Sequence, residues 1–222
     1  MNLNGYAPAF LEAIVDTDRD RAREVIAAAL EAGVTPEEVV FEIVIPVIEQ
    51  RDKRLVDPAE MTLAQHFMTA QIATEVTEEM VPRFRTPPEL LGRVVIGTAQ
   101  GDLHTLGKRI IMGCLRASMM ECVDLGVNVP PERFVDEAVA HDADVIGISA
   151  MMVHTARGEN GCIRVRQLLK ERDLDQRIKI IVGGAPYRFD PDLYKLVGAD
   201  AWAEDGVSAA RVVGELVAEV RR

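Results

Sequence analysis

The chain has little cysteine, no long apolar run and a shortage of positive charge, and each shortage argues against a class of protein. Its three cysteines, Cys114, Cys122 and Cys162, are odd in number and form no CxxC pair, which argues against a disulfide framework or a zinc site. No stretch of about 18 apolar residues is present to span a bilayer, and the amino terminus shows no signal-peptide pattern. We therefore expect a cytoplasmic protein with reduced thiols and no membrane partner.

The 222-residue chain carries a net charge of -11, which argues against a nucleic-acid partner because that binding depends on Lys and Arg contacts to phosphate. The acidity is uneven: up to Leu91 the chain holds 17 acidic and 8 basic residues, against 19 and 17 in the remainder. A proline-rich linker over 82–92 lies at this change and cannot continue a helix. With 48% hydrophobic residues for a core, we expect two domains, 1–88 and 89–222.

Residues 1–85 show only helical patterns and predict a four-helix bundle with short connections. The expected helices cover 6–15, 18–32, a segment that starts at Thr35, and 57 to about 80. The third start is the clearest, because Thr35-Pro36-Glu37-Glu38 combines an N-cap, a proline at the first helical position and a capping glutamate. Pro46 lies well inside this third helix and should kink or divide it.

The apolar residues of the fourth helix do not form one narrow stripe, so this helix should contact neighbours on more than one side. It is either the central helix of the bundle or a helix that also covers a ligand held by the next domain. His66 lies on it. A lone helical histidine is usually a satisfied or solvated residue, and the alternative is a metal-facing role.

From Arg93 onward, short apolar runs alternate with helical patterns, which predicts a parallel, doubly wound sheet with helices on both faces. The expected strands are 94–98, 121–125, 145–149, 178–182 and 201–203. The expected helices are 105–117, 130–139, 163–169, 192–196 and 207–220. The expected architecture is a flavodoxin-like or Rossmann-like domain of strand order 2-1-3-4-5, with a crevice between strands 1 and 3.

Three motifs follow strands 1, 3 and 4 and so fall at the same edge of the expected sheet: Asp102-x-His104-x-x-Gly107, Ser149-Ala150-Met151 and Gly183-Gly184. Each alone has an ordinary explanation as a helix cap or a turn. Together they describe a slot with an imidazole on one wall, a hydroxyl at the floor and a wall without side chains. Such a slot would accept a long planar group between strands. A phosphate site fits poorly, because neither GxGxxG nor GxxxxGK[ST] follows the first strand.

Asp102 and His104 are two residues apart, directly after the flexible Gly101. The carboxylate could therefore accept a hydrogen bond from one imidazole nitrogen while the other nitrogen faces a metal. The alternative is an ordinary polar turn in which Asp102 caps the following helix. The spacing alone leaves both interpretations open.

At these separations, behind a helical bundle, the three motifs resemble the cobalamin-binding proteins of the methionine synthase type, in particular the small corrinoid proteins of methyltransferase systems. The segments 124–132 and 183–186 add to the resemblance, which covers about 92–220 and the bundle in outline. Met151 stands where the family has leucine, a change that conserves volume. The segment 50–56 replaces a glycine-containing segment of the family.

The resemblance implies a cobalamin or related corrinoid in the base-off, His-on form. His104 would be the lower axial ligand of cobalt and Asp102 its hydrogen-bonded partner, a ligand-tuning pair, while the displaced nucleotide tail enters the slot. His66 is a possible upper ligand. The cofactor-binding residues implied are Gly101, Asp102, Leu103, His104, Thr105, Leu106, Gly107, Ser149, Met151, Thr155, Gly183, Gly184, Ala185, Glu204 and Asp205.

The resemblance further implies a protein that carries a methyl group on cobalt between a substrate:corrinoid methyltransferase and a second methyltransferase with a folate or thiol acceptor. A reductive activase is a further expected partner. The chain should be non-catalytic alone, because it is too short to hold a substrate pocket as well. Two alternatives stay open: a light or redox sensor that acts through protein partners, with His66 above the cobalt, and the cobalamin subunit of a mutase.

Overall fold

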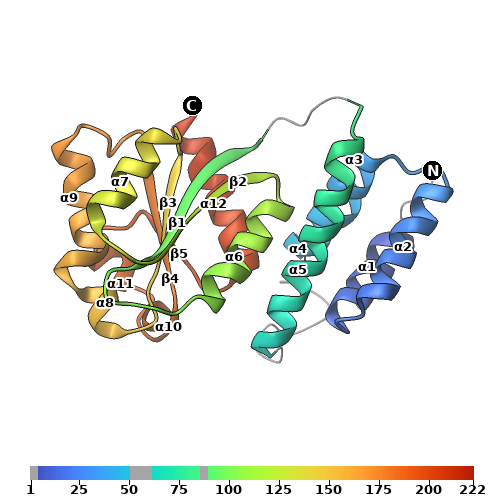
Figure 1. Ribbon diagram of the computed structural model, residues 1–222, viewed down its shortest axis with the longest axis horizontal. Coiled ribbons are helices and arrows are strands. Elements are labelled where there is room, and N and C mark those ends of the chain that lie inside the picture. Colours follow the sequence, from blue (N-terminus) through green and yellow to red (C-terminus); the bar gives the residue numbers. More distant parts are fainter. Residues whose placement is uncertain (1–4, 51–61, 86–89) are drawn as a thin grey trace. The chain divides into compact units, whose positions relative to one another are not determined.

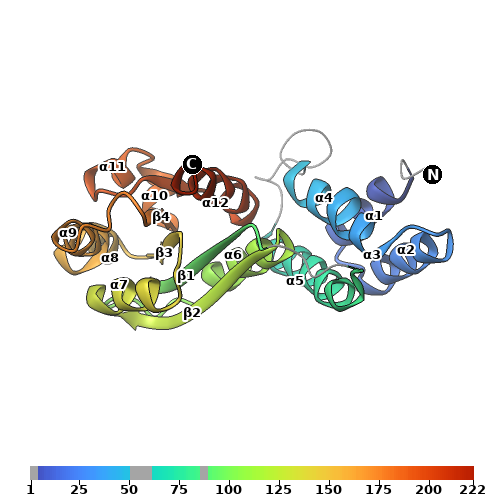
Figure 2. The ribbon, with the colours of Figure 1, turned by 90° about the horizontal axis from the view of Figure 1, so that it is seen from above.

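The computed structural model of the chain describes residues 5–50, 62–85 and 90–222 (Figures 1 and 2). The chain divides into two compact units. One consists of Met1–Glu89 with Arg116–Ser118, and the other of Leu90–Leu115 with Met119–Arg222. Within the described ranges, no helix is long and apolar enough to cross a membrane.

The first unit is helical, as its sequence pattern predicts. Its α-helices are α1 (Tyr6–Val15), α2 (Arg19–Glu31), α3 (Pro36–Glu38), α4 (Ile45–Gln50) and α5 (Leu63–Met80), followed by the 3-10 turn η4 (Val81–Arg83). Side-chain caps set three of the starts: Asp18 accepts from Arg21 N, and Thr35 and Thr62 form capping boxes with the glutamate or glutamine three residues later.

The third helix runs on through Pro46 but is not α-helical throughout. Between α3 and α4 lies the π-helical stretch η2 (Val39–Val44). A proline clashes with the carbonyl of the residue four positions earlier, and a widened turn moves that carbonyl away. The disturbance predicted at Pro46 therefore takes the form of a wider turn before it. The predicted start of the fourth helix at Asp57 lies outside the described residues; within them, α5 begins at Leu63.

The α5 helix supplies much of the core of the first unit. Ile72, Ala73, Val76 and Met80 are buried along one side of it, and the helix contacts α1, α2 and η2. The buried Thr69 hydroxyl donates to the carbonyl of Ile14 at 3.1 Å, which fixes α5 against α1. A central position for this helix explains why its apolar residues form no narrow stripe.

The second unit is a five-stranded parallel sheet of order β2-β1-β3-β4-β5, which confirms the predicted topology. Its strands are β1 (Gly92–Ala99), β2 (Met120–Val129), β3 (Val145–Ser149), β4 (Lys179–Gly183) and β5 (Ala201–Ala203). Its helices are α6 (Leu106–Ala117), α7 (Pro131–Ala140), α8 (Val153–Arg157), the π-helical η5 (Glu159–Ile163), α9 (Arg164–Glu171), α10 (Ala185–Phe189), α11 (Leu193–Leu196) and α12 (Gly206–Val220).

Helices cover both faces of this sheet, because successive strand residues point to opposite sides. Val95 belongs to the core that includes α7 and α9, whereas Val94 and Ile96 face α6 and α12. Figure 1 shows α7 and α9 on one side of the strands and α6 and α12 on the other. The doubly wound arrangement is therefore as predicted.

Two features of the second unit were not predicted. The β2 strand is longer than expected, and its pairing with β1 shifts register on both sides of Gly97. The short helices α8 and α10 follow β3 and β4 directly, where the sequence suggested loops. Both differences lie beside the candidate site described below.

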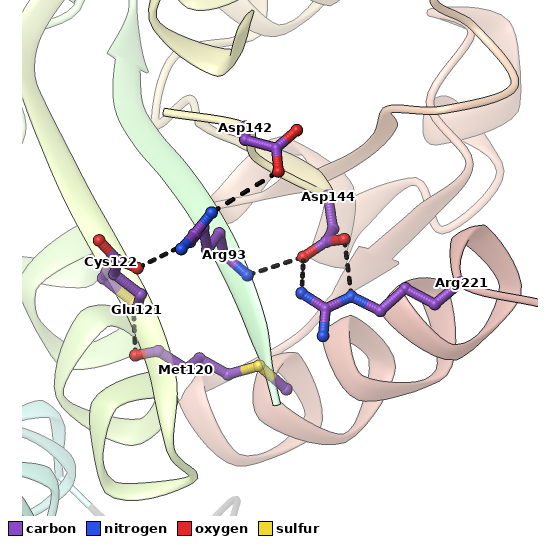
Figure 3. A network of polar contacts seen from close by, with 7 residues as sticks. All are labelled: Arg93, Met120, Glu121, Cys122, Asp142, Asp144 and Arg221. Atoms are coloured by element: carbon purple, nitrogen blue, oxygen red, sulfur yellow. Dashed lines mark hydrogen bonds and ion pairs between the residues drawn. The ribbon is translucent and has the colours of Figure 1, made fainter. Parts of the chain in front are cut away.

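At the amino ends of the strands, a polar network holds the sheet to the end of α12 (Figure 3). Asp144 accepts from the backbone N of Arg93 at 2.8 Å and from Nε and an Nη of Arg221 at 3.0 and 2.9 Å. The hydrogen bonds to Asp144 raise the pKa of Arg221. Arg93 also contacts Glu121 across to β2. A bidentate pair of this kind has a fixed geometry, so it joins β1, β3 and α12 at the edge opposite the candidate site.

Candidate functional site

The predicted motifs meet at the carboxyl edge of the sheet. The strand register pairs Thr98 of β1 with Ser149 of β3, Ser149 with Gly183 of β4, and Gly183 with Ala203 of β5. Small residues thus form a row across the sheet at the point where the loops leave it. In parallel sheets this edge is the usual place for a ligand.

The loop after β1 turns at Gly101, whose φ of +85° lies in the region that favours glycine. Asp102 comes next and is buried, although its neighbours on the loop are exposed. Its Oδ1 accepts from the backbone N of His104 at 3.0 Å and lies 2.6 Å from His104 Nδ1. Its Oδ2 accepts from the backbone N of Met151 at 2.7 Å and from the Thr155 hydroxyl at 3.1 Å. The carboxylate therefore joins the β1 loop to the loop and helix that follow β3.

These contacts keep Asp102 charged. Burial by itself would raise the pKa of the carboxyl group, because it disfavours the ionised form. The hydrogen bonds from the backbone of His104 and Met151 and from the side chains of His104 and Thr155 outweigh burial and lower the pKa to about 2. A buried anion is thus available to orient a neighbouring imidazole.

His104 is that imidazole. Its side chain is 56% exposed, and its Nδ1 is turned to Asp102. A carboxylate partner makes Nδ1 the donor nitrogen, so Nε2 carries the lone pair and is the nitrogen available to a metal. The Thr98 hydroxyl donates to the carbonyl of His104 at 3.0 Å and so fixes the main chain of this residue. The interpretation of Asp102 as a plain helix cap is therefore insufficient, because the carboxylate also binds the imidazole and two groups after β3.

An apolar rim surrounds the imidazole. Five large apolar side chains are exposed here: Leu103 on the loop after β1, Leu106 at the start of α6, and Met151, Met152 and Val153 on the segment that enters α8. Thr105 is also exposed, and the space around Gly107 is open. Exposed apolar patches of this kind mark ligand or partner sites. An apolar surface with an imidazole in it would suit a flat apolar ligand that carries a metal at its centre.

Behind the row of small residues lies a narrow cavity of about 20 Å³, lined by β1, β3, β4 and β5 on one side and by α6 and α12 on the other. Its lining is apolar except for the buried Ser149, and a group larger than about one water molecule would have to widen it. The cavity lies on the α6/α12 face of the sheet. β1 and β3 are hydrogen-bonded neighbours, as the predicted strand order requires, and a crevice outside their carboxyl ends stays a prediction.

Glycine is required at the end of β4. Gly184 has φ +120°, and a Cβ there would lie 2.0 Å from the carbonyl oxygen of Ala150. A Cβ on Gly183 would lie 3.3 Å from the Ala203 carbonyl oxygen and 4.0 Å from the Ile111 side chain, which lines the cavity. The half-buried Ala185 begins α10 directly after this pair. The bare wall predicted from the sequence is present on this side.

The two acidic residues after β5 have structural partners. Asp205 is the N-cap of α12, and its Oδ1 accepts from the backbone N of Val207 and Ser208 at 3.0 and 2.8 Å. Glu204 pairs with Arg188 of α10 at 2.9 Å on the exposed surface. A role for either residue beside a nucleotide tail stays a prediction. His66 lies on α5, and its side chain is outside the described part of the chain.

Two further residues lie beside the loop, and neither was predicted as a site residue, although one of them lies in the segment 124–132 that adds to the resemblance. Asn128, near the end of β2, accepts from the backbone N of Gly101 at 2.8 Å. Lys108 on α6 is buried and binds both the Asp124 carboxylate and the carbonyl of Gly126. The burial of Lys108 cannot be read from the sequence, so no local signal identified this residue.

These residues fit a corrinoid. Cobalt in a corrin ring already has four ring nitrogens, so a single imidazole with a free Nε2 is a sufficient protein ligand. The exposed apolar side chains around His104 match a flat macrocycle, and the apolar cavity with its hydroxyl lies on the same edge of the sheet. The donor set and the apolar surroundings therefore agree with the cofactor that the motifs suggest.

Comparison with known proteins gives the same family. A family model described as a B12 binding domain matches residues 92–211, and a second of the same description matches 7–79. Dimethylamine corrinoid protein 3 of Methanosarcina acetivorans is 31% identical over 217 residues, 97% of this chain and 99% of that protein. Trimethylamine corrinoid protein 1 of Methanosarcina mazei is 34% identical over 211 residues, 93% of each chain.

Among solved structures, the methanol:cobalamin methyltransferase complex MtaBC of Methanosarcina barkeri contains a chain of the same fold. The TM-score is 0.74 at 24% identity, and the match covers 97% of this chain and 81% of that one. The first of these family models spans the motifs after β1, β3 and β4, and the second covers most of the helical unit. The chain therefore belongs to the B12-binding family of corrinoid proteins that serve methyltransferases.

Proposed function

We propose that this protein carries a methyl group on a corrinoid cobalt from a substrate:corrinoid methyltransferase to a second methyltransferase. The observation that carries the proposal is the exposed His104 imidazole, held at Nδ1 by the buried Asp102 and surrounded by apolar side chains. When bound, the corrinoid supplies the nucleophile that accepts and releases the methyl group. The protein then has to hold the cofactor and leave its reactive face accessible.

In this proposal His104 Nε2 would be the protein ligand of the cobalt, and the cofactor would be held base-off, His-on. Asp102 fixes the ring orientation through Nδ1, and Thr155 and Met151 N fix Asp102. The cavity beside Ser149 would hold the displaced nucleotide base, and Ile111 and the other lining side chains would have to move apart to admit it. Gly184 lets the loop after β4 approach the loop after β3 closely, because a Cβ there would clash with the Ala150 carbonyl oxygen.

The same pair could hold a proton. If His104 Nε2 were released from a bound cobalt, that nitrogen would be free to accept a proton, and the Asp102 carboxylate, 2.6 Å from Nδ1, would stabilise the positive charge.

The partners are proposed from the relatives. Proteins named for dimethylamine and trimethylamine, and a chain of a methanol:cobalamin methyltransferase complex, share the family or the fold. We therefore propose a substrate-specific methyltransferase as donor partner, a folate or thiol methyltransferase as acceptor partner, and a reductive activase. Residues 1–88 are proposed as the helical cap and 89–222 as the cobalamin-binding domain. No described contact favours the sensor, because the side chain of His66 lies outside the described residues.

Reconstitution followed by methyl transfer tests the proposal. The purified protein is incubated with hydroxocobalamin, freed of unbound cofactor, reduced with titanium(III) citrate and offered methanol or methylamines with the matching Methanosarcina methyltransferases. We expect bound cofactor in the base-off form and methylation by at least one of these systems. His104→Ala should lose the His-on spectrum, whereas His154→Ala, an exposed histidine on the same sheet edge, should keep it. Absence of retained cofactor, or the same spectrum in all three proteins, would contradict the proposal.

A further inference from the structure

The main chain of the Asp102 loop is held from the β2 side by a single residue. Gly101 N donates to Asn128 Oδ1 at 2.8 Å, and Asn128 N donates to the carbonyl of Asp102 at 3.0 Å. Asn128 thus contacts the loop with both its side chain and its backbone. The carboxylate of Asp102 is held from the opposite side, by Met151 N and the Thr155 hydroxyl. The residue that orients His104 is therefore fixed from both neighbouring strands of β1.

The conformation of Asn128 restricts which residues suit this position. Its φ of +51° lies in the left-handed region, which favours glycine, asparagine and aspartate. Of these three, only asparagine and aspartate have a side-chain oxygen that can accept from Gly101 N. Backbone geometry and hydrogen bonding thus call for the same two residue types.

A buried lysine supports the end of β2 that carries Asn128. The pairing of β2 with β1 shifts between Asp124 and Gly126, a bulge that turns the following residues toward the loop. Lys108 Nζ donates to the Gly126 carbonyl at 2.9 Å and to the Asp124 carboxylate, which also accepts from Gly126 N at 2.8 Å. Because Lys108 lies in the first turn of α6, the same interaction joins the far end of the site loop to the bulge.

We propose that Asn128 is a positioning residue for the axial imidazole: it fixes the main chain at Gly101 and Asp102, and through Asp102 sets the direction of His104 Nε2. The inference rests on the proposed ligation of cobalt by His104. It assigns to β2 a part in cofactor binding that the motifs after β1, β3 and β4 do not include. Asn128 acts on the ligand through the loop and does not touch the metal.

Two substitutions at this position separate its contributions. Asn128→Gly keeps the left-handed backbone and removes the acceptor, whereas Asn128→Asp keeps both. Each is reconstituted with hydroxocobalamin, and the dissociation constant and the fraction of His-on spectrum are measured. Loss of one hydrogen bond to the loop should weaken binding about three- to tenfold in Asn128→Gly and lower its His-on fraction. Asn128→Asp should bind within about twofold of the wild type, because both contacts remain possible.

Urea unfolding of each apoprotein distinguishes positioning from folding. Positioning predicts weaker binding by Asn128→Gly with little change in the unfolding midpoint, since glycine suits the backbone and water can bind the exposed Gly101 N in place of the lost acceptor. Wild-type affinity and spectrum in Asn128→Gly, or equal losses in the glycine and aspartate variants, would overturn the inference. His104→Ala distinguishes failure of this inference from failure of the proposed function. If His104→Ala binds hydroxocobalamin like the wild type, the proposed ligation is wrong. If His104→Ala loses affinity and Asn128→Gly does not, only the role of Asn128 is refuted.

Discussion

Replacing Asp102 with asparagine in the cofactor-free protein should destabilise the second unit by a calculable amount. The pKa of Asp102 lies at about 2 instead of 3.8, and this difference corresponds to about 2 kcal/mol of stability from the charged form at neutral pH. Four donors converge on the two carboxylate oxygens. An asparagine has one oxygen, so its NH₂ group must face two of those donors. We therefore expect the free energy of unfolding to fall by about 2–4 kcal/mol.

Urea unfolding followed by tryptophan fluorescence measures this loss, because the single tryptophan, Trp202, lies on β5 of the same unit. A fall of 2–4 kcal/mol should lower the midpoint by about 1–2 M urea. Asp142→Asn is a matched control: this carboxylate is 73% exposed and its positive φ suits asparagine. The control should change the free energy of unfolding by less than about 0.5 kcal/mol.

The pH dependence follows from the lowered pKa of Asp102. A carboxyl group whose pKa is lower in the folded state contributes its full stability above the unfolded value of 3.8, and loses it as the pH falls toward 2. The contribution of Asp102 to the gap between wild type and Asp102→Asn should therefore shrink below about pH 4. A gap under about 0.5 kcal/mol at pH 7, or one that widens in acid, would refute the reasoning.

Three further substitutions test other parts of the site. Gly184→Ala places a Cβ 2.0 Å from the Ala150 carbonyl oxygen at φ +120°, so urea unfolding should show a fall in the free energy of unfolding above about 2 kcal/mol. The control Gly107→Ala has open space around the new Cβ and should be nearly neutral. Equal effects of the two substitutions would contradict the close contact at Gly184. Thr155→Val removes a donor to Asp102 and should cost about 1 kcal/mol by the same assay; an unchanged midpoint would show that this bond adds nothing. Asp205→Ala removes the N-cap of α12 and should lower the free energy of unfolding by about 1–2 kcal/mol, while the dissociation constant for hydroxocobalamin stays the same. Weaker binding at unchanged stability would favour the predicted cofactor contact instead.

The sheet and the central pair of the site could be predicted because their signals are local. Each strand is a short apolar run, and alternation with helices fixes a parallel order with all strand ends on one edge. Asp102 and His104 follow the first such run directly, so their position at that edge needed no long-range information. The same reasoning placed Ser149 and Gly183 beside them.

The remaining features depend on contacts between distant segments. Asn128 follows a bulge in β2, and its string Gly126-Val127-Asn128 resembles the end of a strand instead of its continuation. Asp205 precedes Gly206, which is a poor helix former, so the sequence did not indicate that α12 begins there with Asp205 as its N-cap. The third helix continues through Pro46 because η2 widens the turn before it. The pattern of residue types does not indicate such a π-helical turn.

The nitrogen that binds the cobalt is the most direct test of ligation by His104. The protein is produced with ¹⁵N-histidine, loaded with unlabelled cobalamin, and reduced to the Co(II) state for electron paramagnetic resonance. Ligation by His104 predicts that each cobalt line is split into a doublet by ¹⁵N, in place of the triplet that ¹⁴N gives, and that the doublet is lost in His104→Ala. A triplet that persists in the labelled wild-type protein would show that the cofactor's own base remains bound, and would contradict the account.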